Sequence, residues 1–571
     1  MGQLFEELKR RSVFRVGIAY LVVSWLLIQV AEAACFGVPD LVLDNGHILT
    51  MDSDGTVASA VRIRGARLIA IDDVGDRSDP CVKVIDLGGH TVIPGLIDSH
   101  THFIRTAQQP GYMIHGLESA SSIAELLAVL RSSAQTVPTG ELISVVGGFS
   151  PIQFSEQRLP TYQELDDAVP DHPVYLQEGY LTAGVVNSRG RQYFEQHGFA
   201  IDDSHIAAAR SPALDILLRN QSPAQIERRF SEYLRYASSV GLTTVVDAGC
   251  CHWLGTHVAA DELPGMKYAE KFWREGKLPL RLRLHFNHRG SIDQQGLQSV
   301  SARIENATMG LGDDMFKVVG VGEQVIGRFE DAASEEETFD VYRLIAKKRW
   351  TLSQHAMTEN EIEFYLRIME NVAREVPIGA LRWTLEHVFE ITPEQIFRLQ
   401  AIGVSVRVQN QDYLNDKDAI GYWRFGPPFR TLLESGIRMG AGTDSGTVSP
   451  LNPWLSIEFM VTGKNAAGAV LIPGQQISRL DALRLYTAAN AWFTFEEDQL
   501  GSLEAGKLAD LTVIDRPYLS IDVAEIREIK SLMTMVNGKI VHTTGAFENP
   551  VPGTKRTVSV VPGARIEPAL P

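Results

Sequence analysis

The sequence predicts an α/β protein whose main part is a (β/α)8 TIM barrel. Two features of the chain carry this prediction. In its middle, eight strand-like segments end in polar residues, and helical patterns such as 340–350 and 392–403 lie between several of them. At both ends, short β-rich runs alternate with Asn-Gly and Asp-Gly turns. We therefore expect a barrel together with a small β-sandwich domain built from both chain ends.

The first 38 residues predict a membrane anchor or a signal segment. Basic residues between positions 9 and 15 precede the apolar run 16–31, which predicts an N-terminal hydrophobic helix. The run is shorter than the roughly 20 residues of a full membrane span, so a retained anchor and a cleaved signal are both open. The positive-inside rule puts the first residues in the cytoplasm. We expect an inner membrane-anchored or exported protein with a periplasmic or other extracytoplasmic catalytic domain.

The β-sandwich domain is expected to comprise residues 39–93 and 491–548, where the turn-rich β pattern occurs. The stretch 549–571 is rich in Pro and Gly, which is typical of an extended tail. The four cysteines have the spacing neither of a disulfide framework nor of a zinc site. We expect them to be buried thiols.

The barrel is expected to span residues 94–490, with an insertion at about 105–235 that lies over the barrel mouth. In such a barrel, polar side chains at the carboxyl ends of the strands converge on one face. The eight predicted strands are 95–102, 243–249, 281–287, 316–322, 350–356, 383–388, 404–410 and 439–445.

Six side chains on these strands suit metal binding. His100 and His102 are two positions apart on one strand and therefore project from the same face. Imidazoles and carboxylates are the usual ligands of zinc, and a lysine can join them when carbon dioxide has carbamylated it. The other four side chains, on four further strands, are Lys317, His355, His387 and Asp444.

These residues resemble the pattern of the amidohydrolase superfamily: His-x-His on strand 1, Lys on strand 4, single His on strands 5 and 6, and Asp on strand 8. The branch that contains N-substituted formamide deformylases, amidohydrolase family 3, is the most similar. The motifs that carry the likeness lie at 94–102, 384–388, 440–445 and 487–515. The resemblance implies one or two Zn²⁺ ions held by His100, His102, Lys317, His355, His387 and Asp444.

The sequence departs from the superfamily pattern after Lys317. The family usually has Asp-Gly shortly after this lysine, whereas this chain reads FKVVGVGEQ. A carbamylated, metal-bridging Lys317, a purely structural Lys317 and a metal-binding role for Glu323 are therefore all open.

The resemblance also implies a reaction, the hydrolysis of an amide-type C–N bond by a metal-activated hydroxide. Asp444 would act as the general base and return the proton to the departing nitrogen. His387 or His355 would help to stabilise the oxyanion. The alternatives are an ester or lactone hydrolase with the same site, and a barrel that binds a ligand without turning it over.

The composition limits the partners. Hydrophobic residues make up 44% of the chain, as in globular proteins, and the formal net charge of -17 goes against a nucleic-acid partner. We expect a small, moderately hydrophobic substrate and contact with a membrane through the N-terminal segment. The sequence leaves open whether the chain forms a homo-oligomer. His252, His285 and His288 are expected near the barrel mouth.

Overall fold

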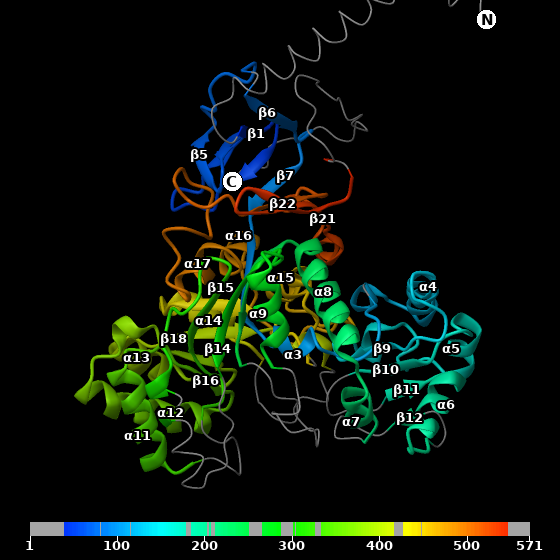
Figure 1. Cartoon of the computed structure of the whole chain (residues 1–571). Helices are drawn as coiled ribbons and strands as arrows, with labels where there is room; N and C mark the ends of the chain where they lie inside the picture. Colours follow the sequence, from blue (N-terminus) through cyan, green and yellow to red (C-terminus); the bar gives the residue numbers. More distant parts are fainter. Residues whose placement is uncertain are drawn as a thin grey trace, which may run out of the picture.

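The structure of the 571-residue chain is a computed structural model. It describes residues 39–547, apart from 80, 115, 179–183, 202–204, 207–211, 250–264, 287–300, 303, 326–332, 416–425, 447 and 546. Three bodies are visible in Figure 1: a β-domain at the top, a barrel below it and a lobe beside the barrel.

The β-domain consists of two packed sheets. The six-stranded sheet draws strands from both ends of the chain, because β20 pairs antiparallel with β7 and places Val513 opposite Val92. Apolar side chains of both sheets, among them Leu43 and Met533, form one core. One sheet has the order β5 (Arg67–Ile71), β4 (Val61–Arg64), β1 (Asp40–Asp44), β6 (Val82–Asp86), and the other β22 (Lys539–Thr543), β21 (Ser531–Val536), β20 (Leu511–Ile514), β7 (Thr91–Pro94), β2 (His47–Leu49), β3 (Val57–Ala58).

The barrel strands form two parallel sheets of four strands each. Single parallel bridges, Val321 to Leu352 and Thr101 to Ser445, connect the two sheets at both seams. The arrangement is a TIM-barrel-type α/β fold, in which two half-barrels face each other, and each predicted strand overlaps one observed strand. The sheets are β8 (Leu96–Thr101), β13 (Leu242–Asp247), β14 (Arg281–Phe286), β15 (Phe316–Val321), and β16 (Ser353–Ala356), β17 (Thr384–His387), β18 (Ser405–Gln409), β19 (Met439–Gly442).

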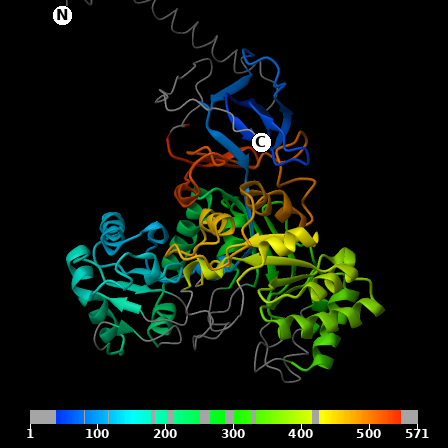
Figure 2. The ribbon, with the colours of Figure 1, turned by 180° about the vertical axis from the view of Figure 1, so that it is seen from behind.

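Helices follow most of these strands and cover the outside of the sheets (Figures 1 and 2). Several begin with a capping box, in which Ser334, Thr358 or Thr392 accepts a hydrogen bond from the backbone of a Glu or Gln three residues later. These sequence-coded starts fix where each strand-to-helix loop ends. The helices are α8 (Pro223–Ser239), α9 (Lys267–Arg274), α11 (Glu335–Lys347), α12 (Glu359–Glu375), α13 (Pro393–Ile402), α14 (Phe429–Ser435), α15 (Pro453–Thr462), α16 (Arg479–Leu485) and α17 (Ala488–Trp492).

The insertion between β8 and β13 folds as a separate lobe with its own apolar core, which includes Leu126, Leu165 and Val174. Figures 1 and 2 show this lobe beside the barrel. Its predicted place over the barrel mouth stays a prediction. After the short α3 (Phe103–Thr106), the lobe contains α4 (Ile123–Ala134), β9 (Ile143–Val146), α5 (Tyr162–Ala168), β10 (Val174–Gln177), β11 (Gly184–Val186), α6 (Ser188–Gln196), β12 (His205–Ile206) and α7 (Pro212–Arg219).

Two predictions are corrected. Within the described ranges, no helix has both the length and the apolar character needed to cross a membrane. This finding goes against the predicted membrane anchor and the inner-membrane location. The segment on which these predictions fall, residues 1–38, lies outside the described ranges, as does the tail 549–571, and membrane contact through that segment stays a prediction. In addition, Cys81 is disulfide-bonded and is not the buried thiol that the sequence predicted.

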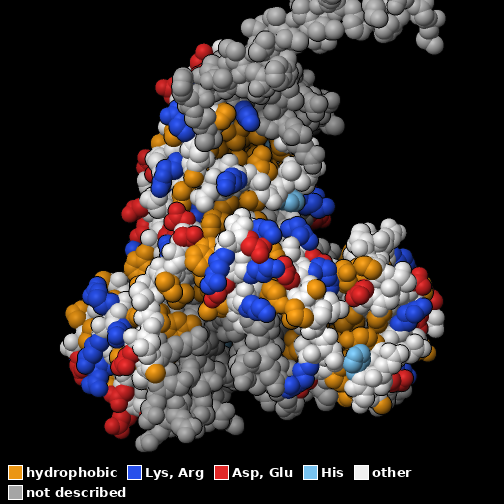
Figure 3. Space-filling view, in the orientation of Figure 1, with side chains coloured by type: hydrophobic (Ala, Val, Ile, Leu, Met, Phe, Trp, Pro, Cys, Tyr) orange, Lys and Arg blue, Asp and Glu red, His pale blue; other side chains and the backbone are white. Residues whose placement is uncertain are grey.

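The surface in Figure 3 carries basic and acidic side chains in alternation over the described part of the barrel and the lobe. On this face the basic residues do not gather in one stripe.

Candidate metal centre

The two histidines of the first barrel strand lie side by side at its carboxyl end. His100 is the fifth residue of β8 and is fully buried, and His102 follows the strand with 7% of its surface exposed. Their ring centroids are 5.6 Å apart. The Nε2 atom of His102 lies 3.2 Å from Oδ1 of Asp444, and Nε2 of His100 lies 3.5 Å from the same oxygen.

Glu323 joins this pair to the other two histidines. It stands two residues after β15, and its Oε1 lies 3.4 Å from Nε2 of His102. Its Oε2 lies 3.1 Å from Nδ1 of His355 and 3.2 Å from Nε2 of His387. Burial by itself would raise the pKa of Glu323, but the neighbouring histidines hold that pKa well below its usual range. The carboxylate is therefore the common neighbour of all the imidazoles.

Asp444 completes the cluster from the last strand. It follows β19 in a left-handed backbone conformation, with φ of 53°, and its backbone N–H donates to the carbonyl of His100 at 2.8 Å. The side chain of Gln411 donates from Nε2 to Oδ2 of Asp444. Although burial opposes ionisation, His100 and His102 keep the pKa of Asp444 well below its usual value. Its Oδ1 thus remains available on the side of the histidines.

The donor atoms of this cluster fit one or two divalent ions. Three sets of three ligand atoms each lie within 4.8 Å of one another: His100, His102 and Glu323; His100, His387 and Asp444; Glu323, His355 and His387. Nε2 of His100 and Oδ1 of Asp444 are buried and make no hydrogen bond within the described residues. Buried polar atoms are normally paired, so these two call for a further partner. Imidazole nitrogens and carboxylate oxygens are ligands of the kind that zinc takes.

Lys317, the sixth predicted ligand, is not part of this cluster. It is the second residue of β15 and so lies near the amino end of the strand, whereas Glu323 follows the carboxyl end of the same strand. Its Nζ lies 3.1 Å from Oε1 of Glu496. Lys317 therefore belongs to the amino end of the barrel strands, whereas the metal-type ligands gather at the carboxyl end. The carboxylate at that end comes from Glu323, one of the alternatives that the sequence left open.

Glu386 is a residue of the site that the sequence reasoning missed. Nδ1 of His100 donates to Oε2 of Glu386 at 2.7 Å, and Glu386 also accepts from Ser353 and Arg407. This bond fixes the imidazole so that Nε2 faces the cluster, as outer-shell carboxylates do at metal sites. The only sequence signal was its place directly before His387. Strand alternation puts neighbouring side chains on opposite faces, which directed attention away from Glu386.

Of the three histidines expected near the barrel mouth, the structure describes only His285. His285 is 1% exposed and burial lowers its pKa well below the usual value, which makes it a neutral interior side chain. His252 and His288 lie outside the described residues.

The fold and the cluster define a class: a TIM-barrel-type α/β protein with a buried metal-binding site at the carboxyl ends of its strands. The chain belongs to the amidohydrolase family, whose model matches residues 83–542.

Individual relatives are distant but similar over nearly their whole length. The chain is 26% identical over 552 residues to the N-substituted formamide deformylase of Arthrobacter pascens, which covers 87% of this chain and 97% of that protein. Among solved structures, an uncharacterised metal-dependent hydrolase from Pyrococcus furiosus has a TM-score of 0.56 and 21% identity, and covers 84% of this chain and 100% of its own. The atrazine chlorohydrolase of Arthrobacter aurescens, solved with zinc, has a TM-score of 0.52 and 15% identity, over 90% and 97% of the two chains. These structures support the fold.

Proposed function

We propose that this protein is a zinc-dependent hydrolase that cleaves the amide-type C–N bond of a small, moderately hydrophobic substrate. The observation that carries the proposal is the joint approach of four histidines to Glu323 and Asp444 at one end of the barrel. Membership of the amidohydrolase family supports the bond type. The N-substituted formamide deformylase is a relative whose name agrees with this chemistry.

Two of the three ligand sets share Glu323. His100 and His102 would hold one ion together with Glu323, and His355 and His387 would hold a second ion together with the same carboxylate. The third set, His100, His387 and Asp444, draws on both groups of histidines. A bound zinc ion supplies Lewis acidity, which lowers the pKa of a water to about 7 and polarises a carbonyl group. In this proposal Glu323 would contribute its carboxylate to the binding of the ions, in place of a carbamylated lysine.

Asp444 is placed to move the proton in this reaction. Its buried, ionised carboxylate accepts a proton from the attacking water as the oxygen forms its bond to the carbonyl carbon. Gln411 donates to Oδ2 of Asp444, whereas Oδ1 makes no hydrogen bond within the described residues. When the C–N bond breaks, Asp444 returns the proton to the departing nitrogen. His355 and His387 keep the other side of the site positively polarised toward the developing oxyanion. The products are a carboxylic acid and an amine.

A substrate panel combined with metal analysis tests the proposal. The purified full-length protein is analysed for its metal-to-protein ratio and is then incubated with N-substituted formamides, other N-acyl amines, cyclic amides, and matched esters and lactones. We expect one or two zinc ions per chain and hydrolysis of at least one amide class. Hydrolysis of esters or lactones alone would replace the bond assignment. Bound metal without turnover of any compound would indicate a binding protein.

A further inference from the structure

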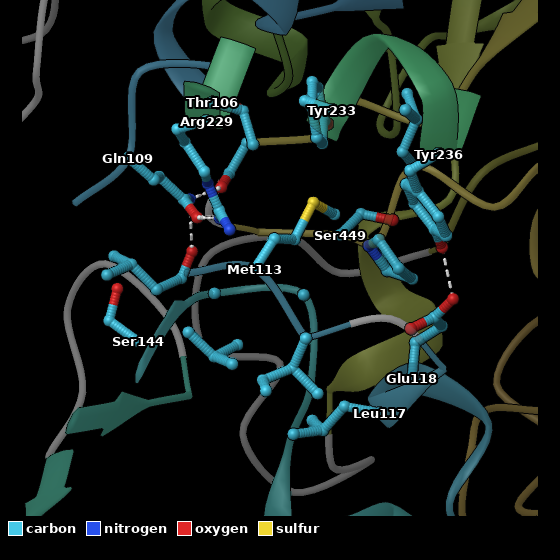
Figure 4. A pocket seen from close by; sticks show the side chains of 18 residues that line it. Thr106, Gln109, Met113, Leu117, Glu118, Ser144, Arg229, Tyr233, Tyr236 and Ser449 are labelled. Carbon is cyan, nitrogen blue, oxygen red and sulfur yellow. Dashed lines mark hydrogen bonds between the residues drawn. The ribbon is translucent and has the colours of Figure 1, made fainter. Parts of the chain in front are cut away.

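A cavity lies between the insertion lobe and the barrel, directly beside the metal cluster (Figure 4). Its wall at the cluster side is Gly446, where an added Cβ would lie 3.2 Å from Cβ of His102. None of the six cluster residues lines the cavity, so it is a neighbouring space and not the metal site itself. Its other walls include Met113, Leu117 and Ser144 from the lobe, Arg229 and Tyr233 from α8, and Ser449 after β19.

Arg229 is the exceptional side chain of this cavity. It is 2% exposed, and its one hydrogen bond runs from Nη2 to Oε1 of Gln109, at 2.9 Å. Within the described residues its Nε and Nη1 atoms are buried without an acceptor, and no carboxylate forms an ion pair with it. The opposing charge that acts on Arg229 is that of Glu232, which forms its ion pair with Arg228. Burial lowers the pKa of Arg229 to about 10, so the side chain remains charged at neutral pH.

Other buried arginines of the chain differ from Arg229 in this respect. Arg281 pairs with Asp510, Arg283 with Glu496 and Arg407 with Glu386, each with a nitrogen-to-oxygen distance of 2.7 or 2.8 Å. A buried charge without such a partner is costly to the folded protein. Figure 4 shows the Arg229 side chain among the residues that line the cavity, next to Gln109. The arrangement suits an anionic group that arrives with a ligand.

We propose that Arg229 binds a carboxylate of the substrate, and that the substrates of this protein are amides of the N-acyl amino acid type. The proposal rests on the proposed hydrolysis and adds the substrate class. A guanidinium group pairs with a carboxylate through two parallel charge-assisted hydrogen bonds, which fixes the ligand's orientation. The scissile amide would then point past Gly446 toward His102 and Asp444.

The remaining walls agree with this ligand. Met113, Ile114 and Leu117 offer apolar surface for a hydrophobic amino acid side chain. The one lining carboxylate, that of Glu118, accepts a hydrogen bond from the hydroxyl of Tyr236, and Figure 4 shows this pair away from Arg229. An anionic group beside Arg229 therefore does not have to contact Glu118.

Calorimetric binding to the full-length, metal-loaded protein tests the proposal without relying on turnover. The Asp444→Asn variant serves as the background, so that the ligands are not consumed. The two probes are N-acetylleucine and its neutral analogue N-acetylleucinamide. We expect the carboxylate to bind at least tenfold more tightly than the amide, and Arg229→Met to abolish this difference.

Arg228→Met is the matched control. Arg228 is the next residue of the same helix, but its charge is paired with Glu232 at 3.1 Å and its guanidinium covers the ring of Tyr112. This variant should keep the preference for the carboxylate. If Arg229→Met does not fold, as judged by circular dichroism, Arg229→Lys retains the charge without the planar fork and should reduce the preference.

The outcomes separate the two proposals. Equal affinity of the background protein for both probes, or an unchanged preference in a folded Arg229→Met protein, would overturn the role of Arg229, even if the protein hydrolyses amides. A preference that depends on Arg229 would support the carboxylate site. If the wild-type protein showed that preference but hydrolysed no amide in the panel, the proposed hydrolysis would fail while the binding site stood.

Discussion

The two ends of the barrel strands treat buried charge in opposite ways. At the amino end, Arg281 meets Asp510 and Arg283 meets Glu496, and each pair has good hydrogen-bond geometry. At the carboxyl end, imidazole nitrogens and carboxylate oxygens gather at 3.1 to 3.6 Å, and Nε2 of His100 makes no hydrogen bond within the described residues. At the amino end, each of these charged groups has a partner in the chain. At the carboxyl end, ligand atoms remain that another group can bind.

The difference follows from what each end connects. Asp510 and Glu496 belong to the segment between the barrel and the C-terminal strands of the β-domain, so their ion pairs attach that segment to β14. The carboxyl end carries the loops and the residues of the proposed chemistry. Lys317 and Glu323 lie at opposite ends of β15 and show this difference on a single strand. Lys317 forms an ion pair with Glu496, whereas Glu323 lies among the histidines of the cluster.

The largest expected effect is the loss of metal on removal of the shared carboxylate. Glu323→Gln replaces an anionic oxygen by an amide at the centre of the cluster, so we expect most of the bound metal to be lost, as measured by elemental analysis. Lys317→Met is the control and should keep its metal. The reverse pattern, with metal lost only from Lys317→Met, would restore the lysine as a ligand.

The next effect concerns turnover. Asp444→Asn keeps the size of the side chain but removes its ability to take a proton, so kcat for a hydrolysed amide should fall by about 10²- to 10⁴-fold. The metal-to-protein ratio, determined on the same sample, should change much less. Retained kcat would exclude Asp444 as the general base.

At the amino end, the expected effect is on stability. Arg283→Met leaves the buried Glu496 with Lys317 alone, and breaking a buried ion pair in this way costs about 3–5 kcal/mol. Denaturant unfolding measures the loss, and the bound metal should be retained. A variant as stable as the wild-type protein would show that the pair contributes little to the attachment of this segment.

The smallest effect is a dependence of stability on pH. Burial would raise the pKa of Glu496, but the hydrogen bond and charge of Arg283 outweigh it and lower the pKa to about 2. The ionised Glu496 thus stabilises the fold above its unfolded pKa of about 4.5, and this contribution is lost as the pH falls toward 2. Compared with Glu496→Gln, the wild-type protein should therefore lose more stability between about pH 4.5 and pH 2. Parallel curves for the two proteins would contradict this assignment.

Much of the fold is encoded locally, which is why the sequence predicted it. Polar residues after short apolar runs marked all eight barrel strands, and capping residues such as Ser334 and Thr358 marked helix starts. The position of the insertion lobe depends on packing between distant surfaces, so its place beside the barrel did not follow from the sequence.

The sequence by itself determined the histidines and the aspartate of the candidate site, because His100, His102, His355, His387 and Asp444 stand where strands end. Only the tertiary structure shows that Glu323, and not Lys317, lies among these side chains. Both flank one strand, and the choice depends on which end faces the other ligands. The same holds for Glu386 and Arg229. The role of a buried charge depends on which partners the fold places next to it, and these partners are distant in the sequence.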